Sequence, residues 1–279
     1  MRALITIPAR IGSTRFPQKP LHLIAGRSLL QRVVQIAKTA ARADDVAFVV
    51  AVDDDKVAAH CKEIGAPWVM TDPDLPSGSD RALAAAHVYC EKTGTALPDF
   101  VLNLQGDAPF TPPEHVEVLI EAARNTAGAD VFTPVIQLDW AALDALRDHK
   151  QAHPYSGTTC VRNGAGEALW FSKQILPAIR GENDLRAGSD LSPVLRHIGL
   201  YGYRFAALQR FTELGKGHYE SLEGLEQLRF LENGMRIHAA LVASPQLSMS
   251  GVDTPADAQL AEELIARHGD PYDVLEARL

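Results

Sequence analysis

The sequence predicts an α/β protein with a doubly wound, mostly parallel sheet and a mixed-sheet insertion. Two observations support this fold class. Short apolar runs alternate with amphipathic runs of helical spacing through the first half of the chain. The length of 279 residues also allows a large buried core. In sheets of this kind ligands bind beyond the carboxyl ends of the strands, so the loops there are the first places to look for chemistry.

The first half of the chain is expected to alternate strand and helix throughout. The predicted strands are the apolar runs LITI, VAFVVAV, PWVM, DFVLNL and ADVFTPV. The predicted helices occupy residues 28–41, 54–64, 80–89 and 114–124. No internal repeat or low-complexity tract interrupts this order, so repeat architectures are excluded.

The second half is less regular. TTCVRN and EALWFS predict an antiparallel hairpin, and HIGLYGYR predicts a further strand. LEGLEQLRFLENG has helical spacing up to a stop at Asn233-Gly234, RIHAALV predicts another strand, and a last helix should follow Pro255. We therefore expect a single domain over residues 1–279, with the mixed-sheet insertion near residues 135–200.

Composition narrows the class of function. A formal net charge of −8 argues against nucleic-acid binding, which needs a basic face. No signal-peptide pattern and no run of eighteen apolar residues is present, so we expect a cytoplasmic protein without a membrane partner. Cys61, Cys90 and Cys160 are widely spaced and form no C-x-x-C pair, which favours buried free thiols.

The loop after the first predicted strand, IPARIGSTRFPQKPL, concentrates positive charge. It matches neither the Walker pattern nor G-x-G-x-x-G. Gly12 and Ser13 can bring backbone N–H groups close to an anion, while Arg10, Arg15 and Lys19 supply two guanidinium forks and an ammonium. Such a set suits a triphosphate with its metal. A solvated basic turn is the alternative, but the position at a strand end favours function.

A second polar segment is LPSGSDR. Asp80 can act in capping the helix that follows, and Arg81 would project from its first turn. A cation at a helix N-terminus opposes the helix dipole, so Arg81 makes more sense beside a bound anion. An ordinary loop with a helix cap remains the structural alternative.

A third segment, NLQGDAPF, delivers Gln105 and Asp107 to the end of an apolar strand. Asp107 is a candidate metal ligand, and Asp253 in GVDTP is its candidate partner. Mg²⁺ is typically held by one or two carboxylates together with substrate phosphates. Each aspartate taken singly is explained as a turn residue, but the pair predicts a magnesium site.

The run VDDDK offers a competing hypothesis. Asp53 and Asp55 form a D-x-D pair at a strand end, as in sugar-nucleotide glycosyltransferases that hold a metal in this way. We interpret Asp53 to Asp55 instead as capping the helix that begins there and complementing its dipole.

Six segments together resemble the 3-deoxy-manno-octulosonate cytidylyltransferase family in order and approximate spacing. They are IPARIGSTRFPQKPL, SGSDR, NLQGDAPF, RHIGLYGYR, LEQLRFLENG and GVDTPAD. The resemblance covers nearly the whole chain. It implies the nucleotide-diphospho-sugar transferase type of fold, Mg²⁺, a homodimer, and synthesis of CMP-Kdo and pyrophosphate from CTP and 3-deoxy-D-manno-octulosonate (Kdo) for lipopolysaccharide biosynthesis.

The resemblance also implies roles for individual residues. The triphosphate would be cradled by Arg10, Ser13 and Lys19, and the cytidine nucleotide would be held with help from Ser77, Arg81 and Gln105. Mg²⁺ would be bound by Asp107 and Asp253, and the catalytic group would comprise Arg10, Lys19, Asp107 and Asp253. The acid sugar would be contacted by Lys173, His197, Tyr201, Glu226 and Gln227. The insertion would serve sugar binding and dimerisation.

Three short stretches depart from the family pattern. The family usually has SGTDR or SGTER, QGDEP and FSR, where this chain has SGSDR, QGDAP and FSK. Ala108 removes a carboxylate beside the metal loop, and Lys173 replaces a planar guanidinium with a point charge. Two alternatives therefore stay open. The chain could act on a related acid sugar, such as a modified octulosonate or a sialic acid, or it could be a non-catalytic CTP-binding protein.

Overall fold

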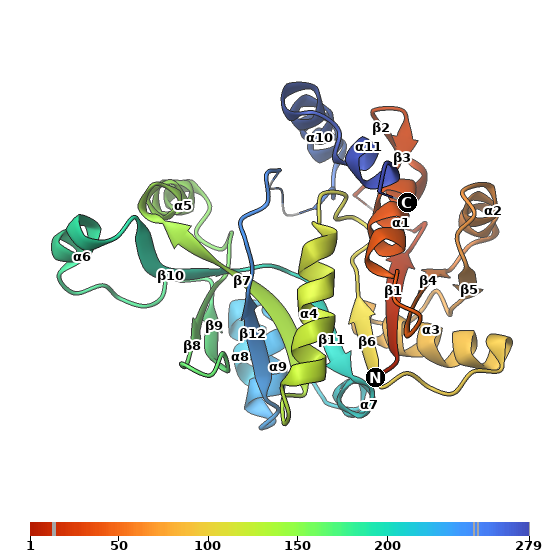
Figure 1. Ribbon diagram of the computed structural model, residues 1–279, viewed down its shortest axis with the longest axis horizontal. Helices are drawn as coiled ribbons and strands as arrows, with labels where there is room; N and C mark the ends of the chain where they lie inside the picture. The colour runs from red at the N-terminus through yellow and green to blue at the C-terminus, as the bar shows by residue number, and fades with distance from the viewer. Residues whose placement is uncertain (13–14, 248, 250, 279) are drawn as a thin grey trace. The chain divides into compact units, whose positions relative to one another are not determined.

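The computed structural model describes residues 1–12, 15–247, 249 and 251–278. The chain divides into two compact units, which are described separately (Figure 1). Unit 1 comprises Met1–Ile120, Gly202–Thr212 and Pro245–Leu279, and unit 2 comprises Glu121–Tyr201 and Glu213–Ser244. The expected insertion at residues 135–200 falls within unit 2.

Unit 1 contains the first four of the five strands predicted from the first half of the chain. β1 (Ala3–Ala9) lies between β4 (Val46–Val52) and β6 (Phe100–Asn103), and β5 (Trp68–Met70) pairs with β4 on its outer side. β11 (Tyr201–Arg204) follows β6 in the strand order. The chain runs outward from β1 to β4 and β5 and then returns to the other side of β1 as β6. This reversal creates a topological switch point, where open α/β sheets bind ligands.

Helix caps explain where the helices of unit 1 begin. Ser28 caps α1 (Leu29–Ala40), and Asp54 caps α2 (Asp55–Glu63) by accepting a hydrogen bond from the Lys56 N–H at 2.7 Å. Helix α3 (Gly78–Thr93) begins two residues before its predicted start, and its cap is Ser77. Asp80, which we expected to act in the cap, instead donates its own backbone N–H to the Ser77 hydroxyl at 3.1 Å.

The remaining elements of unit 1 are short or lie near the chain ends. A 3₁₀ turn, η1 (Lys19–Leu21), precedes the hairpin of β2 (Leu23–Ile24) and β3 (Arg27–Ser28). The remaining helices are α7 (Phe205–Thr212), α10 (Pro255–His268) and α11 (Pro271–Glu276). Helix α4 (Pro113–Asn125) begins in unit 1 and ends in unit 2. Helices α4 and α10 were predicted, whereas α7 and α11 were not.

Unit 2 contains the mixed sheet. Its central strand, β7 (Val131–Asp139), pairs in parallel with β12 (Ile237–Leu241) and antiparallel with β10 (Leu191–His197). The hairpin of β8 (Thr159–Arg162) and β9 (Ala168–Ser172) is confirmed and continues the sheet from β10. HIGLYGYR is not one strand: β10 ends at His197 and β11 begins at Tyr201, with a tight turn from the Leu200 N–H to the Ile198 carbonyl at 2.8 Å.

The helices of unit 2 differ more from expectation. Helices α5 (Trp140–Ala152) and α6 (Glu182–Gly188) were not predicted. The single helix expected from LEGLEQLRFLENG is broken into α8 (His218–Glu223) and α9 (Gln227–Glu232). Gly224 causes the break, because its φ of 63° is a left-handed conformation that ends α8. The predicted stop at Asn233-Gly234 is confirmed as the end of α9.

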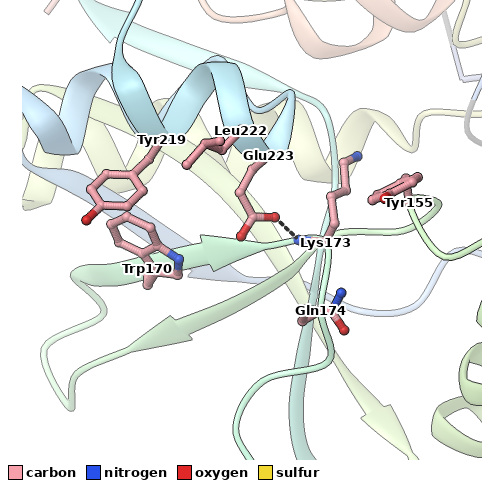
Figure 2. A pocket seen from close by; sticks show the side chains of 7 residues that line it. All are labelled: Tyr155, Trp170, Lys173, Gln174, Tyr219, Leu222 and Glu223. Atoms are coloured by element: carbon pink, nitrogen blue, oxygen red, sulfur yellow. Dashed lines mark hydrogen bonds between the residues drawn. The ribbon is translucent and has the colours of Figure 1, made fainter.

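A hollow of about 400 Å³ opens beside the end of β9 and helix α8 within unit 2. Figure 2 shows the aromatic, aliphatic and charged side chains that line it. They are Tyr155, Trp170, Lys173, Gln174, Tyr219, Leu222 and Glu223. The rings of Trp170 and Tyr219 meet edge to face, with their centroids 5.0 Å apart. The hollow therefore combines aromatic walls with a cation and a carboxylate.

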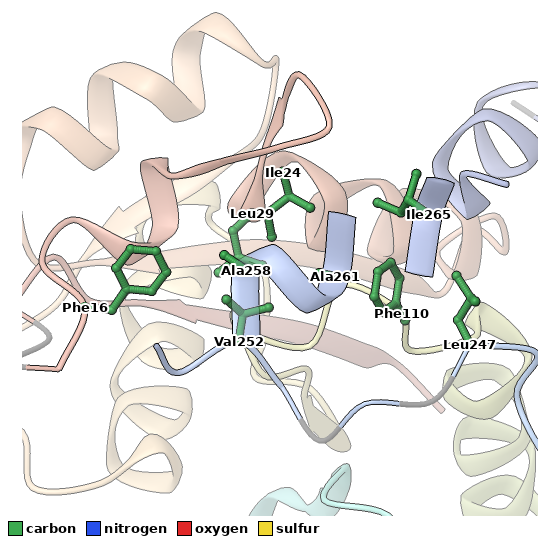
Figure 3. Packing of buried hydrophobic residues seen from close by; sticks show 9 residues of the cluster. All are labelled: Phe16, Ile24, Leu29, Phe110, Leu247, Val252, Ala258, Ala261 and Ile265. Atoms are coloured by element: carbon green, nitrogen blue, oxygen red, sulfur yellow. The ribbon is translucent and has the colours of Figure 1, made fainter. Parts of the chain in front are cut away.

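A hydrophobic cluster in unit 1 joins segments that are far apart in the sequence (Figure 3). Its buried members are Phe16, Ile24, Leu29, Phe110, Leu247, Val252, Ala258, Ala261 and Ile265. Phe16 comes from the opening loop, Phe110 from the segment after β6, and Val252 from the segment before α10. Packing these three side chains together brings the polar residues next to them into one place.

Two expectations from composition concern the cysteines and membrane-spanning helices. The three cysteines are buried free thiols, as predicted. Within the described ranges, no helix has both the length and the apolar character that a membrane crossing requires.

Candidate active site

Asp53 ties the opening loop to the end of β4. Its carboxylate accepts a hydrogen bond from the Ile11 backbone N–H at 3.0 Å and lies 3.7 Å from the Arg10 guanidinium. The Asp53 side chain is only 5% exposed, so the contacts that hold the loop are largely shielded from solvent. We expected Asp53 to share in capping α2, but Asp54 makes the cap and Asp53 holds the loop.

Lys19 lies between the two predicted metal ligands. Its ammonium nitrogen is 2.7 Å from Oδ2 of Asp107 and 3.0 Å from Oδ1 of Asp253. Arg15 adds a guanidinium 3.2 Å from the same Asp253 oxygen. Residues from three distant segments therefore meet at one point beyond the strand ends.

Backbone contacts hold Asp253 beside Asp107. The Val252 N–H donates to the Asp107 carbonyl at 2.8 Å, and the Val252 side chain is buried in the hydrophobic cluster. Thr254 then caps α10 in a reciprocal arrangement with Asp257, which accepts from the Asp253 N–H at 3.0 Å and the Thr254 N–H at 2.8 Å. The orientation of Asp253 is therefore set by the start of α10, which follows it.

The charges of this cluster favour a protonated Lys19. Burial alone would lower the pKa of Lys19, but its hydrogen bonds and charge contacts with Asp107 and Asp253 outweigh burial and raise the pKa. The Lys19 ammonium therefore lies where both carboxylates contact one positive charge.

The same donor set fits a small divalent cation. Two carboxylate oxygens within about 3 Å of one point are hard oxygen ligands of the kind that Mg²⁺ prefers. No cluster of three or more His, Cys, Asp or Glu side chains suited to a metal occurs among the described residues. A cation held by Asp107 and Asp253 would therefore need further oxygen ligands from phosphate or water.

Arg81 occupies an unexpected position. Rather than projecting from α3, its side chain is 1% exposed and donates to the Thr71 hydroxyl at 2.6 Å. Its guanidinium also lies 3.8 Å from Asp53. Burial lowers the pKa of Arg81, and the charge of Asp53 opposes this effect. Arg81 thus lies beside the Asp53 carboxylate that holds the opening loop. Its predicted contact with a nucleotide stays a prediction.

The other predicted nucleotide residues lie near these loops or outside the described part. The Ser77 hydroxyl caps α3 and contacts the Asp80 carboxylate. Gln105 is exposed in the turn after β6, where its carbonyl accepts from the Ala108 N–H at 3.2 Å. Ser13 lies outside the residues that the structure describes.

Part of the predicted sugar group forms a contact network in unit 2. The Tyr201 hydroxyl donates to Oε1 of Gln227 at 3.0 Å, and the rings of His197 and Tyr201 have centroids 5.5 Å apart. Gln227 is 2% exposed, and its amide nitrogen has no hydrogen-bond partner among the described residues. A buried donor of this kind is costly unless a ligand satisfies it. Glu226 immediately precedes α9.

His197 is held neutral. Burial, with the charge of Lys173, lowers the pKa of His197 to about 3. Its Nε2 atom lies 2.8 Å from the Thr133 hydroxyl, which lies 2.8 Å from the Leu200 carbonyl. The hydroxyl has a single hydrogen and also lies 3.2 Å from the Ile198 carbonyl, so the tautomer of His197 depends on which of these acceptors that hydrogen takes.

The predicted site residues thus divide between the two units. Arg10, Ser77, Arg81, Gln105, Lys19, Asp107 and Asp253 belong to unit 1, and Lys173, His197, Tyr201, Glu226 and Gln227 belong to unit 2. Lys19, Asp107 and Asp253 are in direct contact. The site list drawn from the sequence omitted Arg15, although its charge in the opening loop was a signal, and it missed the anchoring role of Asp53, for which no local signal exists.

Comparisons with known proteins identify the relatives of this chain. Residues 4–237 match the profile of a family described as Cytidylyltransferase. The chain is 40% identical to a 3-deoxy-manno-octulosonate cytidylyltransferase of Maricaulis maris, over 97% of this chain and 99% of the relative. It is 37% identical to the enzyme of the same name from Chelativorans sp., over 95% and 98% respectively.

Solved structures agree. A structure described as CMP:2-keto-3-deoxy-manno-octonic acid synthetase complexed with CTP has a TM-score of 0.76 and 33% identity, over 96% of this chain and 99% of that chain. A cytidylyltransferase from Leptospira borgpetersenii, with a TM-score of 0.55 and 15% identity over 99% of this chain and 93% of that chain, supports the fold alone. The predicted α/β nucleotidyltransferase fold is confirmed. The chain belongs to the cytidylyltransferase family, in the group of the 3-deoxy-manno-octulosonate cytidylyltransferases.

Proposed function

We propose that this protein is a nucleotidyltransferase that joins CTP and Kdo to give CMP-Kdo and pyrophosphate, in lipopolysaccharide biosynthesis. The observation that carries the proposal is the contact of Lys19 with both Asp107 and Asp253 beside a basic loop. Relatives at up to 40% identity bear the name of this activity, and one solved relative contains CTP.

The basic loop suits the triphosphate of CTP. Arg10 is fixed at its base by Asp53, and its side chain is still 52% exposed, so it can reach an anion. Arg15 and Lys19 lie beside the carboxylate pair. These three cations would neutralise phosphate charge and orient the nucleotide for attack at the α-phosphorus.

Asp107 and Asp253 are the residues that would hold Mg²⁺. When bound there, the ion would neutralise phosphate charge and lower the pKa of the attacking hydroxyl. The two carboxylates would hold the ion close to the place that the Lys19 ammonium takes here, so Lys19 would turn from them to contact a phosphate oxygen.

The chemical step needs no covalent intermediate with the protein. The anomeric hydroxyl of the acid sugar attacks the α-phosphorus in line and loses its proton to solvent, an O–P bond forms, and the bond to the departing pyrophosphate breaks. Lys19 and Arg10 stabilise the charge that develops on the leaving group. Each such preorganised donor typically contributes about 2.7–4 kcal/mol of transition-state stabilisation.

The sugar side of the reaction is assigned to unit 2. The unsatisfied Gln227 amide and the neutral imidazole of His197 can bind sugar hydroxyls, and the Lys173 ammonium can bind the sugar carboxylate. Because Lys173 is a point charge where the family usually has an arginine, a related acid sugar is the second candidate substrate. A CTP-binding protein without catalysis is the third possibility, but the complete carboxylate and cation set argues against it.

Further parts of the proposal rest on the family likeness. We place the enzyme in the cytoplasm as a homodimer, with the segment near residues 135–200 serving sugar binding and dimerisation. Light scattering on the purified protein measures the assembly directly. A mass near twice the chain mass of 30.3 kDa is expected, and a mass equal to one chain would contradict the dimer.

Pyrophosphate release tests the function. With CTP and Mg²⁺, we expect release with Kdo, loss of at least about a hundredfold in kcat for Asp107→Asn, and a normal rate for the exposed control Asp44→Asn. Release with a sialic acid but not with Kdo would support the second candidate. CTP binding without release on either sugar would overturn the catalytic proposal, and full activity of Asp107→Asn would overturn the metal assignment.

A further inference from the structure

The turn after β9 places Lys173 between two charged side chains that no sequence motif singles out. One is Glu223, the last residue of α8, and the other is Lys150, in the last turn of α5. Both contact the backbone of Lys173, one at its N–H and the other at its carbonyl. All of these residues belong to unit 2.

Glu223 holds the amide side of the turn. Its Oε2 atom accepts the Lys173 backbone N–H at 2.7 Å, and its Oε1 atom accepts the Ser172 hydroxyl at 2.8 Å. Figure 2 shows the first of these bonds as a dashed line, with the Lys173 side chain extending from the anchored backbone beside Tyr155. Hydrogen bonds to an ionised carboxylate are stronger than neutral ones, so this turn is firmly held.

Lys150 holds the carbonyl side. Its ammonium donates to the carbonyl of Lys173 at 2.5 Å and to that of Gly157 at 3.0 Å, and it also contacts the carbonyl of Ser156. In these bonds the Lys150 ammonium donates its hydrogens to backbone carbonyl oxygens. Lys150 therefore joins the loop that carries Tyr155 to the turn that carries Lys173.

The ammonium of Lys173 is the group left available. Among the residues that the structure describes, it makes no hydrogen bond or ion pair, although the charge of Glu223 also acts on it, and it lines the hollow of about 400 Å³. Lysine has a flexible stem and a single point charge, so its position depends on its backbone more than that of a planar arginine fork engaging two oxygens. Fixing the backbone at both the N–H and the carbonyl compensates for that flexibility.

We infer that Glu223 and Lys150 are positioning residues for Lys173, and that they set the affinity for the carboxylate of the acid sugar through the place they give its ammonium. This inference rests on the proposed function, which assigns the acid sugar to this side of the protein. Their effect passes through Lys173, so it should be seen in sugar binding and not in nucleotide binding or in the chemical step.

The test compares Glu223→Gln with Glu167→Gln. The first change keeps the side-chain volume but removes the charge and one of two acceptor positions. Glu167 is the control, because its carboxylate also accepts hydrogen bonds at both oxygens, two from Arg236 and one from Asn163, elsewhere in unit 2. Binding of Kdo is measured by calorimetry in the presence of a CTP analogue with a methylene group between the α- and β-phosphates. We expect Glu223→Gln to weaken Kdo binding about tenfold, the size expected for losing one charged hydrogen bond.

Kinetics on the same proteins separate positioning from general damage. In Glu223→Gln the KM for Kdo should rise while the KM for CTP and the kcat stay within about twofold of wild type. A double-mutant cycle completes the test: in a Lys173→Met background, Glu223→Gln should have no further effect on Kdo binding.

Three outcomes would overturn the inference: unchanged Kdo binding in Glu223→Gln, additive losses in the double variant, or no Kdo binding by the wild-type protein. Pyrophosphate release by the wild-type enzyme reports the proposed function separately. A wild-type protein that binds Kdo in a Glu223-dependent way but releases no pyrophosphate would support the positioning role and overturn the catalytic proposal.

Discussion

At the scale of single residues, the surroundings of a charge decide what it does. Lys19 is paired with two carboxylates, Arg81 is buried as a support for a loop, and Lys173 lines a hollow with its ammonium unpaired among the described residues. The sequence shows three cations next to promising motifs. Only their contacts separate a cation held by two carboxylates from a structural support and from a cation left available to a ligand.

His197 leads to a prediction on pH and stability. Its pKa is about 3 in the folded protein, because burial and then the Lys173 charge disfavour the imidazolium, against about 6.5 in an unfolded chain. Between these values the unfolded state binds a proton that the folded state does not, so stability falls as pH decreases from about 6.5. The slope is about 1.4 kcal/mol per pH unit.

Urea unfolding at pH 7 and pH 5, followed by tryptophan fluorescence, measures this effect, since Trp140 and Trp170 lie in unit 2 and Trp68 in unit 1. The wild-type protein should lose about 2 kcal/mol more between the two pH values than His197→Gln. The exposed His268→Gln should behave like wild type. Equal losses in wild type and His197→Gln would show that His197 is not held neutral.

At the scale of elements, the close packing of the segment after β6 against β1 positions the site. After β6 the chain keeps running beside β1, with the Leu104 N–H bonded to the Thr6 carbonyl at 2.9 Å. Gly106 lies so close to β1 that an added Cβ would be 2.1 Å from the Pro8 carbonyl oxygen. The glycine of QGDAP is therefore needed for the close packing that delivers Asp107 to Lys19.

We predict that Gly106→Ala is destabilising and also impairs catalysis. The new methyl group would meet backbone and not a flexible side chain, so the loop must shift, at a cost of about 1–3 kcal/mol. The same shift should move Asp107 and lower kcat. Gly164→Ala is the control, because nothing lies within 4 Å of its added Cβ. A Gly106→Ala variant as stable as the control would disprove the close-approach argument.

Elements were predicted well where local signals were strong. The apolar strands β1, β4 and β6 were confirmed. The helix cap predicted within VDDDK was also confirmed, and it is made by Asp54. The break at Gly224 and the end of β10 at His197 were missed, because helical and strand spacing continue across them. Those boundaries depend on backbone conformation that packing selects.

At the scale of the whole molecule, distant parts of unit 1 are fastened together by a buried ion pair. Arg32 in α1 is 2% exposed and donates to both oxygens of Asp270, at 2.7 and 3.0 Å. Asp270 caps α11 near the end of the chain. The pair links the segment after Lys19 to the segment after Asp253, so it supports the proposed metal-site residues from a distance.

Asp270→Asn should therefore destabilise the protein by about 3–5 kcal/mol, because it leaves the buried Arg32 guanidinium without its countercharge. Asp273→Asn is the control, since Asp273 is 63% exposed and its ion pair with Arg27 should contribute about 0–1 kcal/mol. Thermal and urea unfolding measure both. Equal effects of the two changes would show that burial of the pair does not matter.

The same pair should contribute to acid sensitivity. Burial alone would raise the pKa of Asp270, but hydrogen bonds from Arg32 and from the Tyr272 backbone lower it overall. The stabilisation is therefore present above the unfolded pKa of about 3.9 and is lost as pH falls through the folded value.

The sequence by itself determined the fold class, the family likeness and the segments that carry charge, because these depend on local periodicity and on motif order. Tertiary structure decided which charges meet. Lys19, Asp107 and Asp253 are separated by up to 234 residues, and their contact depends on the strand reversal around β1 and on the burial of Phe16, Phe110 and Val252 in one cluster. The support of Lys173 by Glu223 and Lys150 likewise has no local signature, since side chains from separate elements must pack together before such bonds exist.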